Sequence, residues 1–300
     1  MKTDYPGIQK ECVECIKNRK LNSYPKGADK AAISDYRDRV NKLLLTLTNE
    51  SSPEVSKMIT DIKAEIFGRE NANEYDFEKI NTYFNELMLG YEQYIDKCIS
   101  SSGDPLKAAV KFSMIGNYID FGAQNTVDEA VLKELIDDNE RFPIDKAVLS
   151  SFSSNIEKAK SIAYFTDNCG EIVFDKLLIR LMHKLNPNMK LYVIVRGKPV
   201  LNDATVKDAL QVGLDKEPGV ILLDNGNDLA GTCLNRIPEH VLDIINGADF
   251  IVSKGQGNYE TLQYSELHAF YIFLCKCELF MSYFNVPRLT GIFTELSGED

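Results

Sequence analysis

The second half of the chain alternates short apolar segments with helical patterns, and this alternation constrains the fold more than any other feature. Helical patterns such as EIVFDKLLIRLMHKL and ATVKDALQVG separate the apolar segments. Strands that are apolar along their whole length and are joined by helices are typical of a parallel sheet covered on both faces. We therefore expect an α/β domain with a mostly parallel sheet over residues 151–300. Its strands are expected at 162–168, 190–197, 219–226 and 248–255, with a further one within 287–295.

The first half of the chain, residues 1–150, is expected to be all-α, because no strand pattern longer than a few residues occurs in it. A long helix is predicted at 77–99, before a loop of serines and glycine. Three shorter helices are predicted from their start signals, which are Ser52-Pro53, Asp104-Pro105 and the capping-box spacing Thr126-x-x-Glu129.

The composition limits the kinds of partner that this protein can have. Of the 300 residues, 44% are hydrophobic and 26% are charged, which is ordinary for a globular protein. A formal net charge of −11 disfavours nucleic acid and anionic membrane surfaces as partners. The apolar segment 268–284 contains charged residues and is too short for a membrane span, so we expect a buried helix there.

The cysteines and the N-terminal residues indicate a compartment. Seven cysteines, an odd and scattered set, argue against a disulfide framework and predict a reducing, cytoplasmic location. The sequence MKTDYPGIQKE contains no apolar stretch, so a secretory signal is not expected. Cys12 and Cys15 have the spacing of half a zinc site or a redox pair, but no second such pair follows. We expect them to be buried thiols.

Polar residues gather at the carboxyl side of four successive predicted strands. They are Asp167-Asn168, the segment 196–203, Asp224-Asn225 and the segment 254–258. In open parallel sheets, ligands bind in the crevice outside these strand ends, and loops there carry function because the sheet fixes them. This pattern predicts a binding or catalytic site at one edge of the sheet.

The first two of these loops contain ligands for a hard cation. Asp167 and Asn168 supply a carboxylate and an amide carbonyl, and Asp203 supplies a second carboxylate. Such a set suits Mg²⁺ or Mn²⁺ better than zinc, because no His or Cys completes a tetrahedral set nearby, Cys169 excepted. The alternative is that these residues are only N-caps of the helices that follow the strands.

The fourth loop, SKGQGNYETL, combines a cation with glycines. Lys254 follows a buried strand, and Gly255 and Gly257 would let the backbone approach an anion closely. Arg196 and Lys198 are additional cations for the same anion. The alternative is a plain glycine turn capped by Asn258. The loop matches neither a Walker loop nor a dinucleotide fingerprint.

These segments resemble a known family. Four motifs of the second half of the chain resemble the metal-dependent damage-control phosphatases: DNCGE, LNDAT, GTCLNRIPE and SKGQGNYETL. Two motifs of the first half, ECVEC and GNYIDFG, add to this resemblance. This family was formerly domain of unknown function eighty-nine, and the match is to its prokaryotic stand-alone branch. The resemblance implies a helical region followed by a three-layer α/β/α core. It also implies hydrolysis of phosphate monoesters of small metabolites with a divalent metal such as Mn²⁺, Mg²⁺, Co²⁺ or Ni²⁺.

The resemblance assigns roles to particular residues. It implies that Asp167, Asn168 and Asp203 bind the metal and that Lys254 faces the substrate phosphate. It implies that Asn117 and Asp120 of GNYIDFG approach the site from the helical half. The remaining residues that we assign to the phosphate-binding set are Gly170, Gly255, Gly257 and Asn258.

The expected mechanism is attack on the phosphoryl group by a water molecule that the metal orients or deprotonates. Direct attack by Asp167 is disfavoured, because a carboxylate that binds a metal is a poor nucleophile and the D-x-D motif of aspartyl-phosphate enzymes is absent. Two other functions stay open. One is an S-adenosylmethionine-dependent carboxyl methyltransferase, although DNCGE has a single glycine. The other is a non-catalytic binding protein whose polar corners are caps.

Overall fold

The computed structural model describes residues 7–71, 75–122 and 126–297. More than half of the N-terminal segment MKTDYPGIQKE, in which no secretory signal is expected, lies outside the described residues. The chain divides into two compact units, residues 2–77 and residues 78–300. This division differs from the predicted boundary at residue 150. The helices between 78 and 150 belong with the sheet, because they cover one of its faces.

The smaller unit is helical. It contains α1 (Lys10–Lys20), α2 (Lys30–Leu45), α3 (Ser52–Phe67) and the short 3₁₀ helix η1 (Arg69–Asn71). Its core is formed by Ile16, Tyr36, Val40, Val55 and Ile59.

The predicted helix at Ser52-Pro53 in this unit is confirmed, and a capping box sets its start. The Ser51 hydroxyl accepts a hydrogen bond from the Glu54 backbone N–H, and the Glu54 carboxylate accepts one from the Ser51 backbone N–H. The expectation that Cys12 and Cys15 are both buried is wrong. Cys15 is exposed and Cys12 is half-buried, and both are free thiols on α1.

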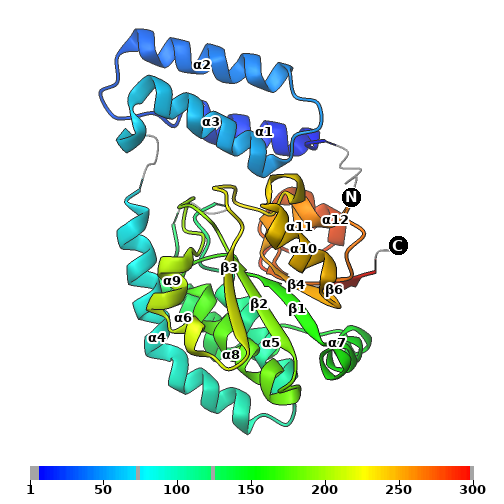
Figure 1. Cartoon of the computed structure of the whole chain (residues 1–300). Coiled ribbons are helices and arrows are strands. Elements are labelled where there is room, and N and C mark those ends of the chain that lie inside the picture. Colours follow the sequence, from blue (N-terminus) through cyan, green and yellow to red (C-terminus); the bar gives the residue numbers. More distant parts are fainter. Residues whose placement is uncertain (1–6, 72–74, 123–125, 298–300) are drawn as a thin grey trace. The chain divides into compact units, whose positions relative to one another are not determined.

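The larger unit is built on a mostly parallel sheet (Figure 1). Within the described residues the sheet has six strands, in the order β3-β2-β1-β4-β5-β6. The first five run parallel to one another, and β6 pairs with β5 in the antiparallel direction. The strands are β1 (Ser161–Phe165), β2 (Lys190–Val195), β3 (Val220–Asp224), β4 (Phe250–Lys254), β5 (Ala269–Leu274) and β6 (Gly291–Leu296).

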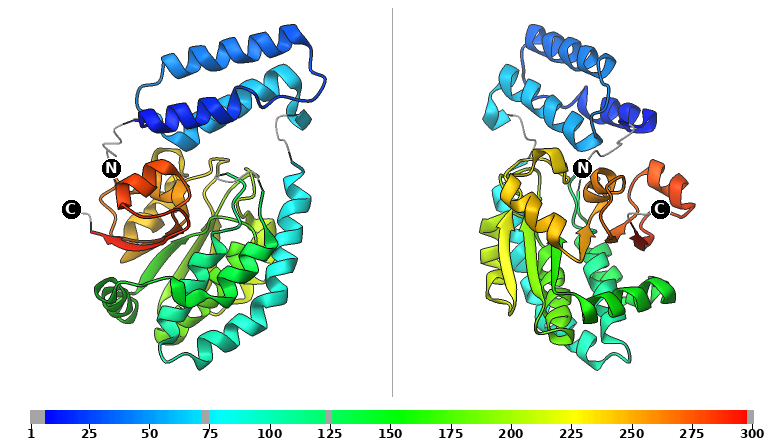
Figure 2. Two further views of the ribbon diagram at one scale, coloured as in Figure 1. Left: turned by 180° about the vertical axis from the view of Figure 1, so that it is seen from behind. Right: turned by 45° about the vertical axis from the view of Figure 1, so that its right-hand side comes forward.

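Helices cover both faces of this sheet, so the predicted three-layer α/β/α core is confirmed (Figure 2). Side chains alternate between the faces, as they must in a strand: Ile162 and Tyr164 of β1 pack on one side, and Ala163 and Phe165 pack on the other. One face carries α4 (Phe77–Ser101), α5 (Pro105–Gly116), α6 (Glu129–Asp137), η2 (Asn139–Arg141), α7 (Lys146–Lys158), α8 (Glu171–Leu185), α9 (Val206–Gln211) and η3 (Leu214–Lys216). The other carries η4 (Leu234–Arg236), α10 (Glu239–Gly247), α11 (Gln256–Leu262) and α12 (Glu278–Phe284).

The segment 268–284 corrects a prediction, because it is not one buried helix. It forms strand β5 and, after a short break, helix α12. All six residues of β5 are buried, so the strand has no polar alternation, and its apolar run continues into the apolar residues of α12. A uniformly apolar run does not distinguish a buried strand from a buried helix.

The start of α6 corrects a second, smaller prediction. Thr126 is not the N-cap of this helix. The cap is Asp128, whose side chain accepts hydrogen bonds from the backbone N–H groups of Ala130 and Val131. A carboxylate directly before the helix reaches these groups and also interacts favourably with the positive end of the helix dipole.

The strand order reverses at one point of the sheet. From β1 the chain proceeds to β2 and β3 on one side, and β4 and β5 lie on the other side of β1. The order therefore reverses between β1 and β4. In doubly wound sheets the loops at the carboxyl ends of such a pair of strands diverge and leave room for a ligand. The residues that follow β1 and β4 are Thr166 to Asn168 and Gly255.

Candidate metal centre

The corner after β1 positions Asp167 and Asn168. Strand β1 ends at Phe165 and α8 begins at Glu171, so the chain reverses within five residues. Gly170 allows this turn because its φ of 78° is unfavourable for other residues. Both Asp167 and Asn168 are buried. Neither side chain caps α8, since the N-cap is Gly170. The cap alternative therefore does not describe this corner.

The loop after β2 brings Asp203 to the same place. The backbones of Asn168 and Asp203 pair in an antiparallel bridge. The Ala204 N–H donates to the Asp167 carbonyl at 2.8 Å, and the Cys169 N–H donates to the Asn202 carbonyl at 2.7 Å. Asp203 does not cap the next helix either, because the N-cap of α9 is Thr205. The structure thus brings together the three side chains that the sequence predicts as metal ligands.

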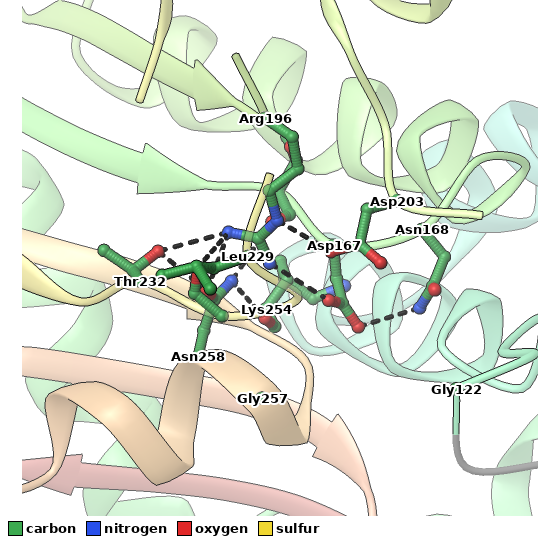
Figure 3. Close-up of polar contacts among 12 residues, drawn as sticks. Gly122, Asp167, Asn168, Arg196, Asp203, Leu229, Thr232, Lys254, Gly257 and Asn258 are labelled. Atoms are coloured by element: carbon green, nitrogen blue, oxygen red, sulfur yellow. Dashed lines mark hydrogen bonds and ion pairs between the residues drawn. The ribbon is translucent and has the colours of Figure 1, made fainter. Parts of the chain in front are cut away.

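Arg196 lies beside both carboxylates (Figure 3). Its Nε donates to Asp203 Oδ2 at 2.7 Å, and its Nη2 lies 3.5 Å from Asp167 Oδ1. Its Nη1 donates to Thr232 Oγ1 at 3.2 Å and to Asn258 Oδ1 at 3.1 Å. Sequence analysis named Arg196 only as an additional cation. The structure shows that it pairs with two of the predicted metal ligands.

Two asparagine amides hold Asp167 from the other side, and both also donate to the Glu171 carboxylate. Asn117, which follows α5, donates from Nδ2 to Asp167 Oδ2 at 3.0 Å and to Glu171 Oε2 at 2.9 Å. Asn168 donates from its own Nδ2 to the same two oxygens, at 2.7 and 2.9 Å. Asn117 therefore reaches the site from a helix of the first half of the chain, as the resemblance implies.

Negative charge accumulates in this cluster. Burial, followed by the charges of Asp203 and Glu171, raises the pKa of Asp167 well above its ordinary value. Burial also raises the pKa of Asp203 to about 6, although Arg196 opposes this rise. With Asp175 included, four buried carboxylates adjoin the two buried cations Arg196 and Lys254. A divalent cation would balance the two excess negative charges.

The donor set fits such a cation. Carboxylate and amide oxygens are the ligands that Mg²⁺ and Mn²⁺ prefer. The Oδ1 atom of Asn168 accepts no hydrogen bond within the described part of the chain, so it is available as a ligand. Across the same residues, no group of three or more His, Cys, Asp or Glu side chains is arranged to hold a metal ion. The predicted set of Asp167, Asn168 and Asp203 is not such a group, because Asn168 contributes an amide oxygen.

Lys254 lies elsewhere than expected. Its side chain is completely buried, and its Nζ donates to Glu171 Oε1 at 2.6 Å, to Asp175 Oδ1 at 2.7 Å and to the Ser113 carbonyl at 2.9 Å. An ammonium group has three donors, and all three are used inside the protein. This geometry does not support the predicted contact between Lys254 and a substrate phosphate.

The glycines and the asparagine of the same loop also serve the protein itself. A Cβ atom on Gly255 would lie 1.9 Å from Asp167 Oδ2, and one on Gly257 would lie 2.2 Å from the Ala230 carbonyl oxygen. Asn258 is completely buried and holds Arg196 in place. These three residues position the site residues, whereas the sequence analysis assigned them to the phosphate.

Gly170 and Asp120, also expected at the phosphate, have other neighbours. A Cβ atom on Gly170 would lie 2.8 Å from Ile119 Cδ1, so a side chain already covers this face of the turn. Asp120 adds negative charge to the cluster and contributes to the raised pKa of Asp167. It is paired with Lys276, whose Nζ donates to Asp120 Oδ2 at 2.6 Å.

The fold and these contacts define a class of protein: a doubly wound α/β protein with a buried acidic centre at the carboxyl ends of its strands. The family model of the damage-control phosphatase ARMT1-like domain matches residues 8–289. Because this match covers most of the 300 residues, the chain belongs to that family.

Two relatives named damage-control phosphatases agree with this membership. The chain is 34% identical over 184 residues to damage-control phosphatase PH1575 of Pyrococcus horikoshii, across 60% of this chain and 61% of that relative. The matched segment thus spans less than two thirds of that relative. A damage-control phosphatase of Archaeoglobus fulgidus is 31% identical over 205 residues, across 67% of this chain and 69% of the relative.

A solved structure agrees with the fold. The crystal structure of a DUF89 family protein from Pyrococcus horikoshii superposes with a TM-score of 0.77 at 26% sequence identity. The superposition covers 96% of this chain and 99% of that one. The resemblance to this family, inferred from the motifs, is confirmed.

Three charged residues of the site region received no site role from the sequence: Glu171 of DNCGE, Asp175 of EIVFDKLLIRLMHKL and Lys276 of the segment 268–284. Each is a buried charged residue that adjoins a buried apolar residue in sequence. Such residues are almost never fully buried unless they are paired, so their position in apolar segments was the available signal.

Proposed function

We propose that this protein is a metal-dependent phosphatase that hydrolyses phosphate monoesters of small metabolites. The observation that carries the proposal is the convergence of Asp167, Asn168 and Asp203 at the carboxyl ends of β1 and β2. Membership of the damage-control phosphatase ARMT1-like family and similarity to two relatives named damage-control phosphatases support it. Mn²⁺, Mg²⁺, Co²⁺ and Ni²⁺ are the proposed metals, since each accepts oxygen ligands.

The residues present divide the work as follows. Asp167, Asn168 and Asp203 would hold the metal. Bound there, a divalent cation would polarise a phosphoryl oxygen and lower the pKa of a water molecule. Arg196 orients the Asp167 and Asp203 carboxylates from one side through its guanidinium group. Asn117 orients Asp167 from the other side.

Water is the proposed nucleophile. Asp167 Oδ2 accepts hydrogen bonds from both Asn117 and Asn168, and Asp167 Oδ1 faces Arg196. A carboxylate with both oxygens engaged is poorly placed to attack phosphorus. The carboxylates of this site therefore position the reactants and hold charge, which is the main requirement of phosphoryl transfer.

The proposal is tested by phosphate release. p-Nitrophenyl phosphate and a panel of phosphorylated sugars and related metabolites are incubated with each of the four metals. Turnover is expected only with metal, and both chelation and Asp167→Ala are expected to reduce kcat at least about a hundredfold. Absence of metal-dependent turnover on every substrate would contradict the proposal.

The methyltransferase alternative is less compatible with the corner after β1. That cofactor needs backbone access at a glycine-rich turn, and here Ile119 covers the one glycine, Gly170. Calorimetric titration with S-adenosylmethionine, with no heat of binding expected, provides the check.

A cytoplasmic location is also proposed. All seven cysteines are free thiols, as a reducing compartment requires. Separately, no helix in the part of the chain that the structure describes has the length and hydrophobicity needed to span a bilayer.

A further inference from the structure

The side-chain amide of Asn168 can face a cation in only one of its two orientations. A metal ligand must be the Oδ1 atom, because the NH₂ group carries two positively polarised hydrogens. In the structure Nδ2 uses both donors, to Asp167 Oδ2 at 2.7 Å and to Glu171 Oε2 at 2.9 Å. The Oδ1 atom is thereby turned away from these two carboxylates.

Glu171 favours this orientation because of how its two oxygens are used. Oε2 faces donors only: it accepts from Nδ2 of Asn117, from Nδ2 of Asn168 and from the backbone N–H of Asn168 at 3.3 Å. Oε1 accepts from Lys254 Nζ at 2.6 Å. A neutral amide at position 171 has one oxygen and one NH₂ group. It therefore could not accept hydrogen bonds from Lys254 and from Asn168 on separate oxygens, as the carboxylate does.

Lys254 forms a buried ion pair with Glu171. Both side chains are completely buried, and a buried carboxylate without a cation is strongly disfavoured. Lys254 is fixed in turn by Asp175 Oδ1 and the Ser113 carbonyl. A chain of contacts therefore runs from Lys254 through Glu171 to the Asn168 amide.

The geometry points to Glu171 and Lys254 as positioning residues for the metal centre: Glu171, paired with Lys254, holds the Asn168 amide so that its carbonyl oxygen faces the cation. This inference rests on the proposed metal site of Asp167, Asn168 and Asp203. It assigns Lys254 an indirect role, in which Lys254 acts on the metal centre through Glu171 and does not contact the substrate phosphate. Substitution of a residue that orients a metal ligand commonly lowers metal affinity by about 10–100-fold.

The first test is the affinity of Glu171→Gln for Mn²⁺, measured by calorimetry on metal-free protein. The glutamine would direct its oxygen toward Lys254, which needs an acceptor, and its NH₂ group toward Asn168. This NH₂ group would favour the orientation of the Asn168 amide in which Oδ1 faces position 171 and not the cation. The dissociation constant is expected to rise at least about tenfold, while the circular dichroism spectrum stays unchanged. Wild-type affinity in folded Glu171→Gln would overturn the inference alone. Absence of Mn²⁺ binding by the wild type would overturn the proposed function as well.

The second test separates orientation from general loss of structure. In Asn168→Asp the two ligand oxygens are equivalent, so no flip can occur. The double variant Asn168→Asp, Glu171→Gln keeps the net charge and gives the new carboxylate an NH₂ donor at position 171. The effect of Glu171→Gln is compared in the Asn168→Asp and wild-type backgrounds, and in the Asn168→Asp background it is expected to weaken Mn²⁺ binding by less than about threefold. An equal loss of Mn²⁺ affinity in both backgrounds would show that Glu171 does not act by orienting Asn168.

A matched pair of lysine variants tests Lys254. Lys176 is also a buried lysine of the same fold unit, and its Nζ donates to Glu92 at 2.9 Å and to the Val212 carbonyl at 2.8 Å. Lys254→Met and Lys176→Met are both expected to lower the melting temperature, but only Lys254→Met is expected to weaken Mn²⁺ binding, by at least about tenfold. Unchanged Mn²⁺ affinity in Lys254→Met, with a raised KM for the phosphate ester, would instead place Lys254 at the phosphate.

Discussion

At the scale of single residues, the site stores more negative charge than its cations neutralise. Asp167 and Asp203 share Arg196, while Glu171 and Asp175 share Lys254. In water such carboxylates would repel weakly, but burial strengthens the repulsion. The raised pKa values of Asp167 and Asp203 express this cost. Under the proposed function, this loss of stability would provide a place in which a cation binds.

Asp203→Asn should separate these two effects. Because the charged form of Asp203 is disfavoured in the folded protein, removing the charge should leave the melting temperature of the metal-free protein at pH 8 equal or higher. Affinity for Mn²⁺ should fall at least about tenfold, because one ligand charge is lost. Thermal unfolding and calorimetry measure the two quantities. A lower melting temperature without a change in metal affinity would instead indicate a structural role for Asp203.

Gly255→Ala tests why a glycine follows β4. The added Cβ would lie 1.9 Å from Asp167 Oδ2, and the φ of 81° strains any other residue. We expect a loss of about 1–3 kcal/mol in the free energy of unfolding, measured in urea, with weaker Mn²⁺ binding. Gly247→Ala is the matched control, since nothing lies within 4 Å of its added Cβ. If the two variants are equally stable, close packing at Gly255 is unimportant.

At the scale of elements, the helix that starts after Asp128 shows how closely a cap depends on local geometry. The two candidate caps, Thr126 and Asp128, lie two residues apart, and only Asp128 accepts hydrogen bonds from the first turn of α6. Asp128→Ala should therefore lower the free energy of unfolding by about 1 kcal/mol. Thr126→Ala, an exposed substitution, should change it by less than about 0.5 kcal/mol. Equal effects of the two substitutions would contradict the assignment of Asp128 as the cap.

Strand β5 shows why one element of the sheet escaped prediction. Both of its faces are covered, by residues of the two core clusters on either side of the sheet, and all of its residues are buried. Its pattern therefore has no period of two. By contrast, β1, β2 and β4 are separated by clear helical patterns and turn residues, and their predicted positions agree with the structure.

At the scale of the whole molecule, the metal should be visible in global stability. A ligand that binds only the folded state at a concentration of 100 times its Kd stabilises by about 2.7 kcal/mol. For a chain of 300 residues this corresponds to a rise in melting temperature of roughly 4 °C. Differential scanning fluorimetry with Mn²⁺, then with excess chelator, measures the rise and its reversal. No rise at any Mn²⁺ concentration would support the view that the polar corners are only structural.

The whole molecule also explains how a chain with a net charge of −11 could bind an anionic ester. The overall field repels phosphate at long range, but it falls off within about 10 Å at ordinary ionic strength. The local charge at the strand ends then decides binding. A bound divalent cation beside Arg196 would balance the two excess negative charges of this region and so remove the local repulsion of the phosphate.

Local patterns along the chain were sufficient to predict the layered sheet and the three polar side chains that gather at its edge. The alternation of apolar and helical segments reflects the period of each element, and Asp167, Asn168 and Asp203 stand directly after strands or in the next loop. Adjacent parallel strands end at the same edge, so these loops had to meet. This is why the clustering of the three side chains could be anticipated.

The partners of the buried charges depended on three-dimensional packing. Lys254 contacts Glu171, 83 residues away in sequence, and Asn117 contacts Asp167, 50 residues away. These contacts form because α5 and α8 pack together on one face of the sheet. This packing also decides which way a side chain at a strand end points. Local periodicity carries no information about such distant neighbours. The sequence therefore indicated a cation at position 254, whereas only the folded chain showed that Glu171 and Asp175, and not an external ligand, neutralise it.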